Sequence, residues 1–189
     1  MLVWNVGGLG TSKRRLRNLI RKYKPSVLAL FEPFAVKELM VYWVNVFGYP
    51  SYGANEAMGG KIWVFWIEDL TFEMQGMSDQ MISGCFSKGD VSINVVLVYA
   101  KCNPVERRLL WHDMEVMRED HIPLLVVGDF NIIRDDRERI GGNPRPLSTM
   151  SEFNSCIHNC GLVEMIGYGG KMSWCNRHRG PSRSWARLD

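Results

Sequence analysis

Five polar residues of this 189-residue chain stand at or just after the ends of strand-like segments. They are Asn5, Glu32, Tyr99, Asp129 and Asn131. Carboxylate oxygens suit Mg²⁺, and amide or phenol groups can donate hydrogen bonds to phosphate oxygens. Each residue alone also fits an ordinary turn or strand end. Gathered at one rim of a fold, the five predict a site for a metal ion and a phosphate.

The segments that lead to these residues are apolar enough to be strands. A short strand is expected at residues 2–6, and apolar runs lie at 26–31, 91–99 and 123–127. Runs of this kind are typical of buried strands. Glycine or proline stands next to Asn5, Glu32 and Asp129 in the chain or close to them, so these polar side chains come where strands stop.

Helical patterns alternate with the strands. Helices are expected at 13–23, 36–47, 104–118 and 148–159, with Thr11 or Ser12 capping the first and Ser148 or Thr149 the last. Segments 61–67, 71–74, 81–86 and 91–99 have the pattern of an antiparallel meander, and a short strand is expected at 172–175. A charged loop is expected at 132–147. The pattern predicts an α/β fold of two packed sheets with helices outside.

Composition sets limits on the class of protein. Hydrophobic residues make up 46% and charged residues 23% of the chain, which indicates one globular domain over residues 1–189 and excludes a disordered chain. No apolar run approaches the roughly 20 residues that span a bilayer, so no membrane protein is expected. Five cysteines without a tight framework or a secretory signal favour an intracellular location.

Basic residues are concentrated in two segments, although the net charge is only +3. Seven basic residues and no acidic one lie between Lys13 and Lys24, and five lie between Lys171 and Asp189 against one acid. The two segments either face phosphates or are solvated surfaces that keep the protein in solution.

Six short motifs follow one order along the chain: WNVGGL at 4–9, LFE at 30–32, VYA at 98–100, GDFN at 128–131, SWCN at 173–176 and RLD at 187–189. With these motifs the chain resembles the endonuclease/exonuclease/phosphatase family of metal-dependent phosphodiesterases over essentially its whole length. GDFN and the WN-plus-glycine opening are the most specific matches. The opening and the SWCN…RLD close look most like the endonuclease domains of plant LINE-type retroelements.

The resemblance implies a four-layered α/β sandwich, with two packed, mainly antiparallel sheets flanked by helices and an incomplete C-terminal end. It implies Mg²⁺ as cofactor, with Mn²⁺ as an alternative, and DNA as partner. It further implies a nuclear location and a parent polyprotein that also carries a reverse transcriptase. The implied function is Mg²⁺-dependent hydrolysis of phosphodiesters by a DNA endonuclease.

Three residues are implied to act on the metal and the water. Glu32 would ligate the catalytic Mg²⁺, with Asn5 beside it. Asp129 would align or deprotonate the attacking water. These roles agree with what phosphodiester hydrolysis requires, namely an activated water and relief of charge in the transition state.

Four further residues are implied to act around the phosphate. Tyr99 would contact the scissile phosphate, and Asn131 would bind one of its oxygens. Asn176 would help to shape the substrate site. Asp189 matches the aspartate that supports the family's catalytic histidine.

One departure from the family pattern bears on activity. A further strand and a Ser-Asp-His motif complete the family's active site, and this sequence ends at Asp189 without that motif. Losing a general acid or base typically costs ~10²–10⁴ in rate. The chain as given is therefore expected to lack part of the catalytic machinery, and a remnant that binds nucleic acid or protein without turnover stays open. The chain is also expected to be a fragment of a longer element.

Other functions have sequence features of their own. A phosphatase for small molecules shares the core motifs of the family. A zinc site could use Cys156, His158, Cys160, Cys175 and His178, but the spacing is unusual and Cys156 and Cys160 fit one core-facing helical stripe better. The Gly7–Gly10 turn lacks the spacing of a dinucleotide-binding loop.

Overall fold

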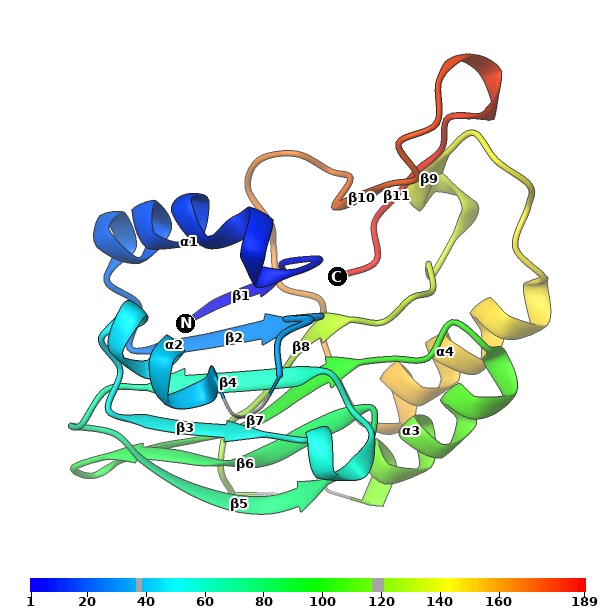
Figure 1. The fold of residues 1–189 in the computed structure, drawn as a ribbon. Helices are drawn as coiled ribbons and strands as arrows, with labels where there is room; N and C mark the ends of the chain where they lie inside the picture. The colour runs from blue at the N-terminus through cyan, green and yellow to red at the C-terminus, as the bar shows by residue number, and fades with distance from the viewer. Residues whose placement is uncertain (37–38, 117–120) are drawn as a thin grey trace. The chain divides into compact units, whose positions relative to one another are not determined.

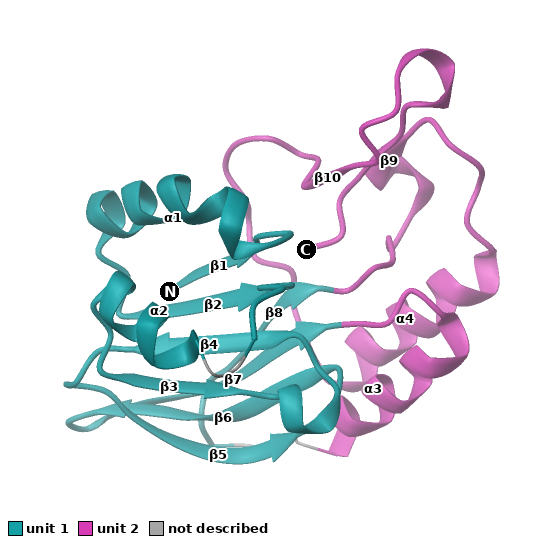
Figure 2. Ribbon diagram, viewed as in Figure 1, with its two compact units in different colours: residues 1–99, 121–129 teal, residues 100–120, 130–189 magenta. Residues whose placement is uncertain are grey.

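The computed structural model describes residues 1–36, 39–116 and 121–189. It divides into two compact units, which Figure 2 distinguishes by colour. Unit 1 contains residues 1–99 and 121–129, and unit 2 contains residues 100–120 and 130–189. Both large sheets and the residues Asn5, Glu32, Tyr99 and Asp129 belong to unit 1.

The first sheet of unit 1 has the strand order β1-β2-β4-β3 (Figure 1). Its strands are β1 (Leu2–Asn5), β2 (Val27–Phe31), β4 (Ile62–Trp66) and β3 (Ser51–Ala54). β1 and β2 are parallel, and β4 runs antiparallel to both β2 and β3. Because β1 and β2 are parallel, Asn5 and the residue that follows β2, Glu32, leave the sheet at the same end.

The second sheet has the order β5-β6-β7-β8. An antiparallel meander of β5 (Thr71–Met77), β6 (Met81–Lys88) and β7 (Val91–Tyr99) is followed by β8 (Leu124–Asp129), which is parallel to β7. The last residues of the two parallel strands are thereby neighbours, because Tyr99 stands opposite Asp129 in the register.

The alternation of side chains along β2 divides the core of unit 1 in two. Val27, Ala29 and Phe31 lie in one cluster with residues of the second sheet, including Ile82, Phe86, Val95 and Leu97. Leu28 and Leu30 lie in the other cluster, with residues of two helices. A strand that is buried on both faces needs the continuous apolar run that the sequence shows here.

The helices of unit 1 are α1 (Leu9–Tyr23) and α2 (Met40–Phe47), and a 3₁₀ turn follows β3 at Glu56–Met58. α1 buries Leu9 and Leu16 against the first sheet, and α2 buries Met40, Trp43 and Phe47. α1 begins four residues before the predicted start, at a Gly8 N-cap whose φ is 104°. Thr11 and Ser12 are therefore inside the first turn, where their hydroxyls donate to the carbonyls of Gly8 and Val6.

Unit 2 contains α3 (Pro104–Val116), α4 (Leu147–Asn159) and a small three-stranded sheet. Trp111 on α3 stacks on Phe153 of α4, with ring centroids 5.2 Å apart. The small sheet has the order β10 (Trp174–Cys175), β11 (Trp185–Ala186), β9 (Arg139–Ile140), and two 3₁₀ turns lie at Asp136–Glu138 and Gly180–Ser182.

The expected α/β fold with two main sheets is confirmed, with three differences besides the earlier start of α1. The segment 61–67 forms β4 of the first sheet and is not part of the meander, because β4 pairs with β2 and β3. The strands β3, β9 and β11 were not predicted, and β9 interrupts the expected loop at 132–147. The α4 helix begins at Leu147 after Pro146, with no side-chain cap from Ser148 or Thr149.

Parts of two expected helices lie outside the described residues. These parts are residues 37–38 of the helix expected at 36–47 and residues 117–118 of the helix expected at 104–118. None of the described helices combines the length and the apolar character needed to cross a membrane.

Candidate active site

Four of the predicted site residues form a ring of neighbours at the strand ends of unit 1. Asn5 and Glu32 come from the first sheet, and Tyr99 and Asp129 come from the second. In the second sheet Tyr99 stands opposite Asp129, and in the first sheet Asn5 stands opposite Phe31, the residue before Glu32. Hydrogen bonds then join Asn5 to Asp129 and Tyr99 to Glu32. The prediction that these residues lie together is met by the geometry of unit 1.

Asn5 and Asp129 make the first link between the sheets. Nδ2 of Asn5 donates to Oδ2 of Asp129 over 3.1 Å, and Oδ1 of Asn5 accepts from the backbone N–H of Gly7 over 3.1 Å. Asp129 is 5% exposed, so its carboxylate has lost most of its water and depends on such donors. The amide of Asn5 therefore fixes the orientation of a buried carboxylate, which an aligned acid or base requires.

Glu32 and Tyr99 make the second link. The hydroxyl of Tyr99 donates to Oε1 of Glu32, and the Tyr99 ring stacks near Phe31 at a centroid distance of 6.1 Å. Lys61 places its ammonium 5.9 Å from the centroid of the Tyr99 ring. A carboxylate, a phenol and a nearby cation are groups that can hold a metal ion and a phosphate oxygen.

Backbone geometry fixes the loop around Glu32 and explains the glycine of the GDFN motif. Glu32 has a φ of 51°, and the loop around it is fixed by hydrogen bonds from Glu32 N to Lys61 O (3.0 Å) and from Gly8 N to Glu32 O (2.8 Å). Gly128 has a φ of 154°, and a Cβ there would meet the carbonyl oxygen of Val98 at 1.9 Å. Only glycine therefore permits β8 to lie this close to β7 just before Asp129.

The donor set of the ring suits Mg²⁺ better than a metal held by many side chains. It offers two carboxylates, Glu32 and Asp129, and the amide oxygen of Asn5. Mg²⁺ is commonly bound by one or two carboxylates together with water and substrate phosphate. Within residues 1–36, 39–116 and 121–189, no three side chains of His, Cys, Asp or Glu form a group that could hold a metal.

Asn131 belongs to unit 2 and is held in the left-handed conformation, with a φ of 51°. Its Nδ2 donates to the carbonyl of Ala100 over 2.7 Å. Asparagine adopts this conformation more readily than most residues, which accounts for its place after Asp129 and Phe130. Its predicted binding of a phosphate oxygen remains a prediction.

Arg107 is a residue of this region that the sequence did not single out. It is 4% exposed on α3, and its Nη1 donates to the carbonyls of Lys101 (3.1 Å), Cys102 (3.3 Å) and Asn131 (2.9 Å). Burial lowers the pKa of its guanidinium. Arg107 thus ties the loop after β7 to the backbone of Asn131. Its spacing of three and seven residues from Leu110 and Met114 is the one feature of the sequence that places it on their side of α3.

The side chain of Asn176 makes its hydrogen bonds within the hairpin between β10 and β11. Its Nδ2 donates to Ser182 O over 2.8 Å, and its Oδ1 accepts from the backbone N–H groups of His178 and Ser184, each over 3.1 Å. These bonds hold a loop that carries Arg177, Arg179 and Arg183. A direct contact between Asn176 and substrate stays a prediction, and the observed bonds describe a residue that shapes the hairpin.

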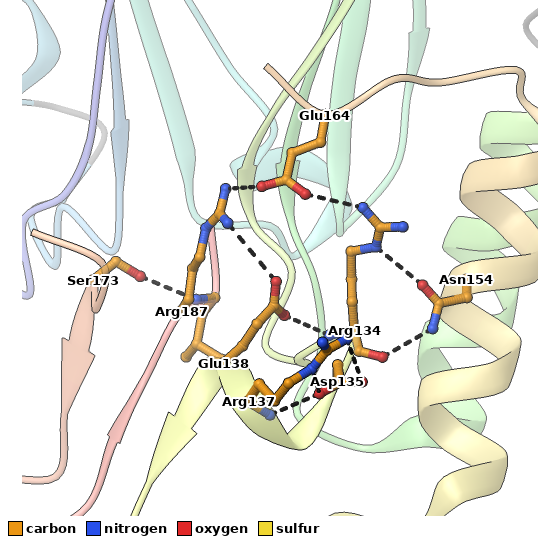
Figure 3. Close-up of polar contacts among 9 residues, drawn as sticks. Arg134, Asp135, Arg137, Glu138, Asn154, Glu164, Ser173 and Arg187 are labelled. Atoms are coloured by element: carbon orange, nitrogen blue, oxygen red, sulfur yellow. Dashed lines mark hydrogen bonds and ion pairs between the residues drawn. The ribbon is translucent and has the colours of Figure 1, made fainter. Parts of the chain in front are cut away.

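Asp189 follows a segment of unit 2 that is fixed by a charged network (Figure 3). Arg187 pairs with Glu164 over 2.5 Å and with Glu138 over 3.8 Å, and Arg134 pairs with Glu164 over 3.1 Å. Ser173 accepts from the backbone N–H of Leu188 over 3.0 Å. The network positions the backbone directly before Asp189.

The carboxyl of Asp189 has a perturbed environment even though the residue as a whole is exposed. Desolvation by neighbouring atoms raises its pKa, while Ser173 and Arg187 act in the opposite direction. The role predicted for Asp189, support of a catalytic histidine, is a prediction that this arrangement does not test.

The alternative of a zinc site receives no support from the described residues. The sulfurs of Cys156 and Cys160 lie 4.0 Å apart on one face of α4, and Cys156 is buried. The neighbouring Cys160 and burial raise the pKa of the Cys156 thiol, which disfavours the thiolate that zinc requires. Cys156 is thus a core residue, as the helical spacing indicated.

A comparison of the sequence with protein families finds a match over nearly the whole chain. The model of the endonuclease/exonuclease/phosphatase family matches residues 2–187. No curated protein matches the chain.

Solved structures with the same fold are distant in sequence. The endonuclease domain of TRAS1, a telomere-specific non-LTR retrotransposon, has a TM-score of 0.72 at 15% identity, with 98% of this chain and 80% of that chain covered. An AP endonuclease from Leishmania major has a TM-score of 0.63 at 14% identity, with 84% and 65% covered. TDP2 from D. rerio, complexed with a single-strand DNA product, has a TM-score of 0.63 at 13% identity, with 98% and 79% covered.

Proposed function

Because the chain belongs to the endonuclease/exonuclease/phosphatase family, we propose that it is a phosphodiester hydrolase that depends on Mg²⁺ and acts on DNA. The observation that carries this proposal is the ring of Asn5, Glu32, Tyr99 and Asp129, in which two carboxylates meet two hydrogen-bonding side chains at the strand ends of unit 1. Hydrolysis of a phosphodiester needs both kinds of group.

The roles follow from the position of each side chain. Glu32, which is half-buried beside Tyr99, would hold Mg²⁺, which supplies Lewis acidity to a phosphate oxygen when bound. Asp129, oriented by Asn5, would take a proton from the attacking water. The phenol of Tyr99 would donate to the phosphate as negative charge develops.

Two residues outside the ring complete the proposal. The side chain of Asn131 would bind a phosphate oxygen, in a loop that Arg107 holds in place. Asp189 would orient the catalytic histidine. The proposal also includes a nuclear location and a parent polyprotein with a reverse transcriptase, both of which follow from the resemblance to LINE-type retroelements.

DNA is favoured over a small phosphate ester by the distribution of charge. The hairpin between Cys175 and Trp185 contains Arg177, Arg179 and Arg183 and no acidic residue. Arg183 also lies 5.1 Å from the ring of Trp185, and cations interleaved with aromatic rings are common in nucleic-acid-binding surfaces. A phosphatase for small molecules would gain little from such a surface.

The test is the nicking of supercoiled plasmid in Mg²⁺ by the purified chain, compared with the same reaction in EDTA. Glu32→Ala and Asp129→Ala are each expected to abolish nicking. Glu73→Ala on the exposed side of β5 is the matched control, because it also removes a carboxylate and should leave the activity intact. Nicking that survives both changes in the ring would refute the proposal.

A second candidate is a protein that binds DNA without turnover, because the arginines of the hairpin between Cys175 and Trp185 would serve binding as well as cleavage. One measurement distinguishes this second candidate from the proposed hydrolase. Salt-sensitive binding of DNA without any Mg²⁺-dependent nicking, unchanged by Glu32→Ala, would indicate this binding remnant.

A further inference from the structure

A stripe of three arginines runs along the outer face of α1. Arg14, Arg17 and Arg21 are spaced by three and four residues, so their side chains lie on one side of the helix. All three are exposed, and with Gly10, Thr11, Lys13 and Asn18 they line a shallow hollow of about 550 Å³. We call Arg14, Arg17 and Arg21 the α1 arginine stripe.

The α1 arginine stripe has no acidic partner among the described residues. The first acidic residue of the sequence is Glu32, so the stripe has no carboxylate within its own helix. Several arginines of unit 2 are ion-paired, such as Arg108 with Glu152, Arg137 with Asp135, and Arg187 with Glu164. The three arginines of the stripe differ from these in having no carboxylate partner among the described residues.

The arrangement is unfavourable for the helix taken alone. Like charges three and four residues apart repel each other and destabilise a helix by a few tenths of a kcal/mol, roughly, for each pair. Arg14 also lies in the half of α1 that is closer to the positive end of the helix dipole. A bound polyanion would remove this repulsion, whereas solvent alone only screens it.

We propose that the α1 arginine stripe binds the sugar–phosphate backbone of the nucleic acid that the site in unit 1 cleaves. The identity of the polymer rests on the proposed function. Guanidinium groups suit this partner, because each presents a planar fork of donors to phosphate oxygens. Three of them in a row supply contacts that do not depend on base sequence.

The connection between α1 and the ring supports a continuous path for one strand. The N–H of Gly8, which caps α1, donates to the carbonyl of Glu32 over 2.8 Å, and the N–H of Leu9 donates to that of Pro33 over 2.9 Å. The first turn of α1 is thus attached to the loop that carries Glu32. A backbone bound at Glu32 can extend from there along the outer face of the helix.

A membrane surface is the other anionic partner to consider, and the packing of α1 disfavours it. Insertion of an amphipathic helix requires a free apolar face. The apolar face of α1 is already packed, since Leu9 and Leu16 are 1% and 0% exposed and Ile20 packs against the same core of unit 1. The helix can offer charge to a partner but no large apolar face.

The experiment measures how DNA affinity depends on salt, by fluorescence anisotropy with a labelled duplex in EDTA. Each phosphate contact contributes about 0.9 to the slope of log K against log salt concentration. Arg17→Gln/Arg21→Gln is expected to reduce the slope by about 2, and the addition of Arg14→Gln by about 1 more. Arg15→Gln/Lys22→Gln is the matched control, because it removes the same charge from exposed positions of α1 that lie off the stripe.

The outcomes separate this proposal from the proposed function. Hydrolysis of bis(p-nitrophenyl) phosphate, which is too small to reach the stripe, should be equal in the parent chain and the stripe variants. If the parent chain hydrolyses neither this ester nor plasmid, the proposed function fails, and the salt slopes still decide the stripe. Equal losses of slope in the Arg17→Gln/Arg21→Gln variant and the Arg15→Gln/Lys22→Gln control would overturn the proposal. An unchanged slope together with lost binding to vesicles of anionic lipid would overturn it as well.

Discussion

Tyr99 and Asp129 stand opposite each other on the parallel strands β7 and β8, and each is hydrogen-bonded to a residue of the other large sheet. Tyr99 donates to Glu32, and Asp129 accepts from Asn5. The four side chains therefore hold one another in place across unit 1. A change at one of them is expected to affect the chemistry through a named neighbour.

Removal of the hydroxyl group of Tyr99 should slow cleavage without unfolding the protein. Tyr99→Phe keeps the ring beside Phe31 but removes the donor to Glu32. Loss of one such donor to developing charge costs about 10²-fold in rate. Single-turnover cleavage of a labelled DNA duplex measures this loss.

The control for Tyr99→Phe is Tyr52→Phe, a matched change at a tyrosine that is exposed on β3. It should leave both the rate and the melting temperature unchanged. A Tyr99→Phe variant that cleaves at the parental rate would exclude the phenol from the reaction.

A second carboxylate in place of Asn5 should move the pH dependence of cleavage. Asn5→Asp replaces the donor 3.1 Å from Asp129 by another acid. Two carboxylates at this distance cannot both ionise easily, so the pKa of the pair rises. The acidic limb of the pH–rate profile is therefore expected to move to higher pH, with a lower maximal rate.

Asn5→Ser provides the comparison for this effect. It removes the amide without adding charge, so it should lower the rate while leaving the acidic limb near its parental position. A profile of Asn5→Asp that coincides with that of Asn5→Ser would show that Asp129 does not act as the base.

The strand-end positions of the ring could be predicted from the sequence, because buried strands have continuous apolar runs and the polar residue after each run is easily found. Parallel pairing then brings neighbouring strand ends together. Gly128 also carried a readable signal, since a glycine directly before Asp129 indicates a close approach of two backbones.

Pairing between distant segments could not be predicted in the same way. Segment 61–67 has the same apolar pattern whether it joins the meander or pairs with β2, and only the packed structure assigns it to the first sheet. The two-residue strands β9 and β11 are too short for any periodicity. Arg107 was missed because a buried arginine has no distinctive sequence pattern when its partners are backbone carbonyls.

Arg107 is expected to act as a positioning residue for Asn131. Arg107→Lys keeps the charge, but a single ammonium on a different stem cannot reproduce the planar donor group that contacts three carbonyls. The rate of cleavage should fall about 10-fold, and the free energy of unfolding should fall by about 1–3 kcal/mol because buried carbonyls lose their donor.

A double-mutant cycle separates positioning from general stability. If Arg107 acts through Asn131, the effect of Arg107→Lys on the rate should nearly vanish when Asn131 is already alanine. Arg108→Lys, at the exposed neighbouring position paired with Glu152, is the control and should not change the rate. Independent, additive effects of the two changes at Arg107 and Asn131 would contradict the positioning role.

Tyr49 should make the stability of unit 1 depend on alkaline pH. Its hydroxyl donates to the carbonyl of Pro25 over 2.7 Å, and burial raises the pKa of Tyr49 to about 12. In the unfolded chain its pKa is about 10, so between these values the folded state holds a proton that the unfolded state has released. This contribution to the free energy of unfolding is fully present below pH ~10 and is lost as the pH rises towards ~12, with a change of about 2–3 kcal/mol.

Urea unfolding at several pH values measures this decline in the free energy of unfolding. Tyr49→Phe should remove most of the decline, whereas the control Tyr52→Phe should keep it. A decline that is equally steep in the Tyr49→Phe variant would assign it to other groups.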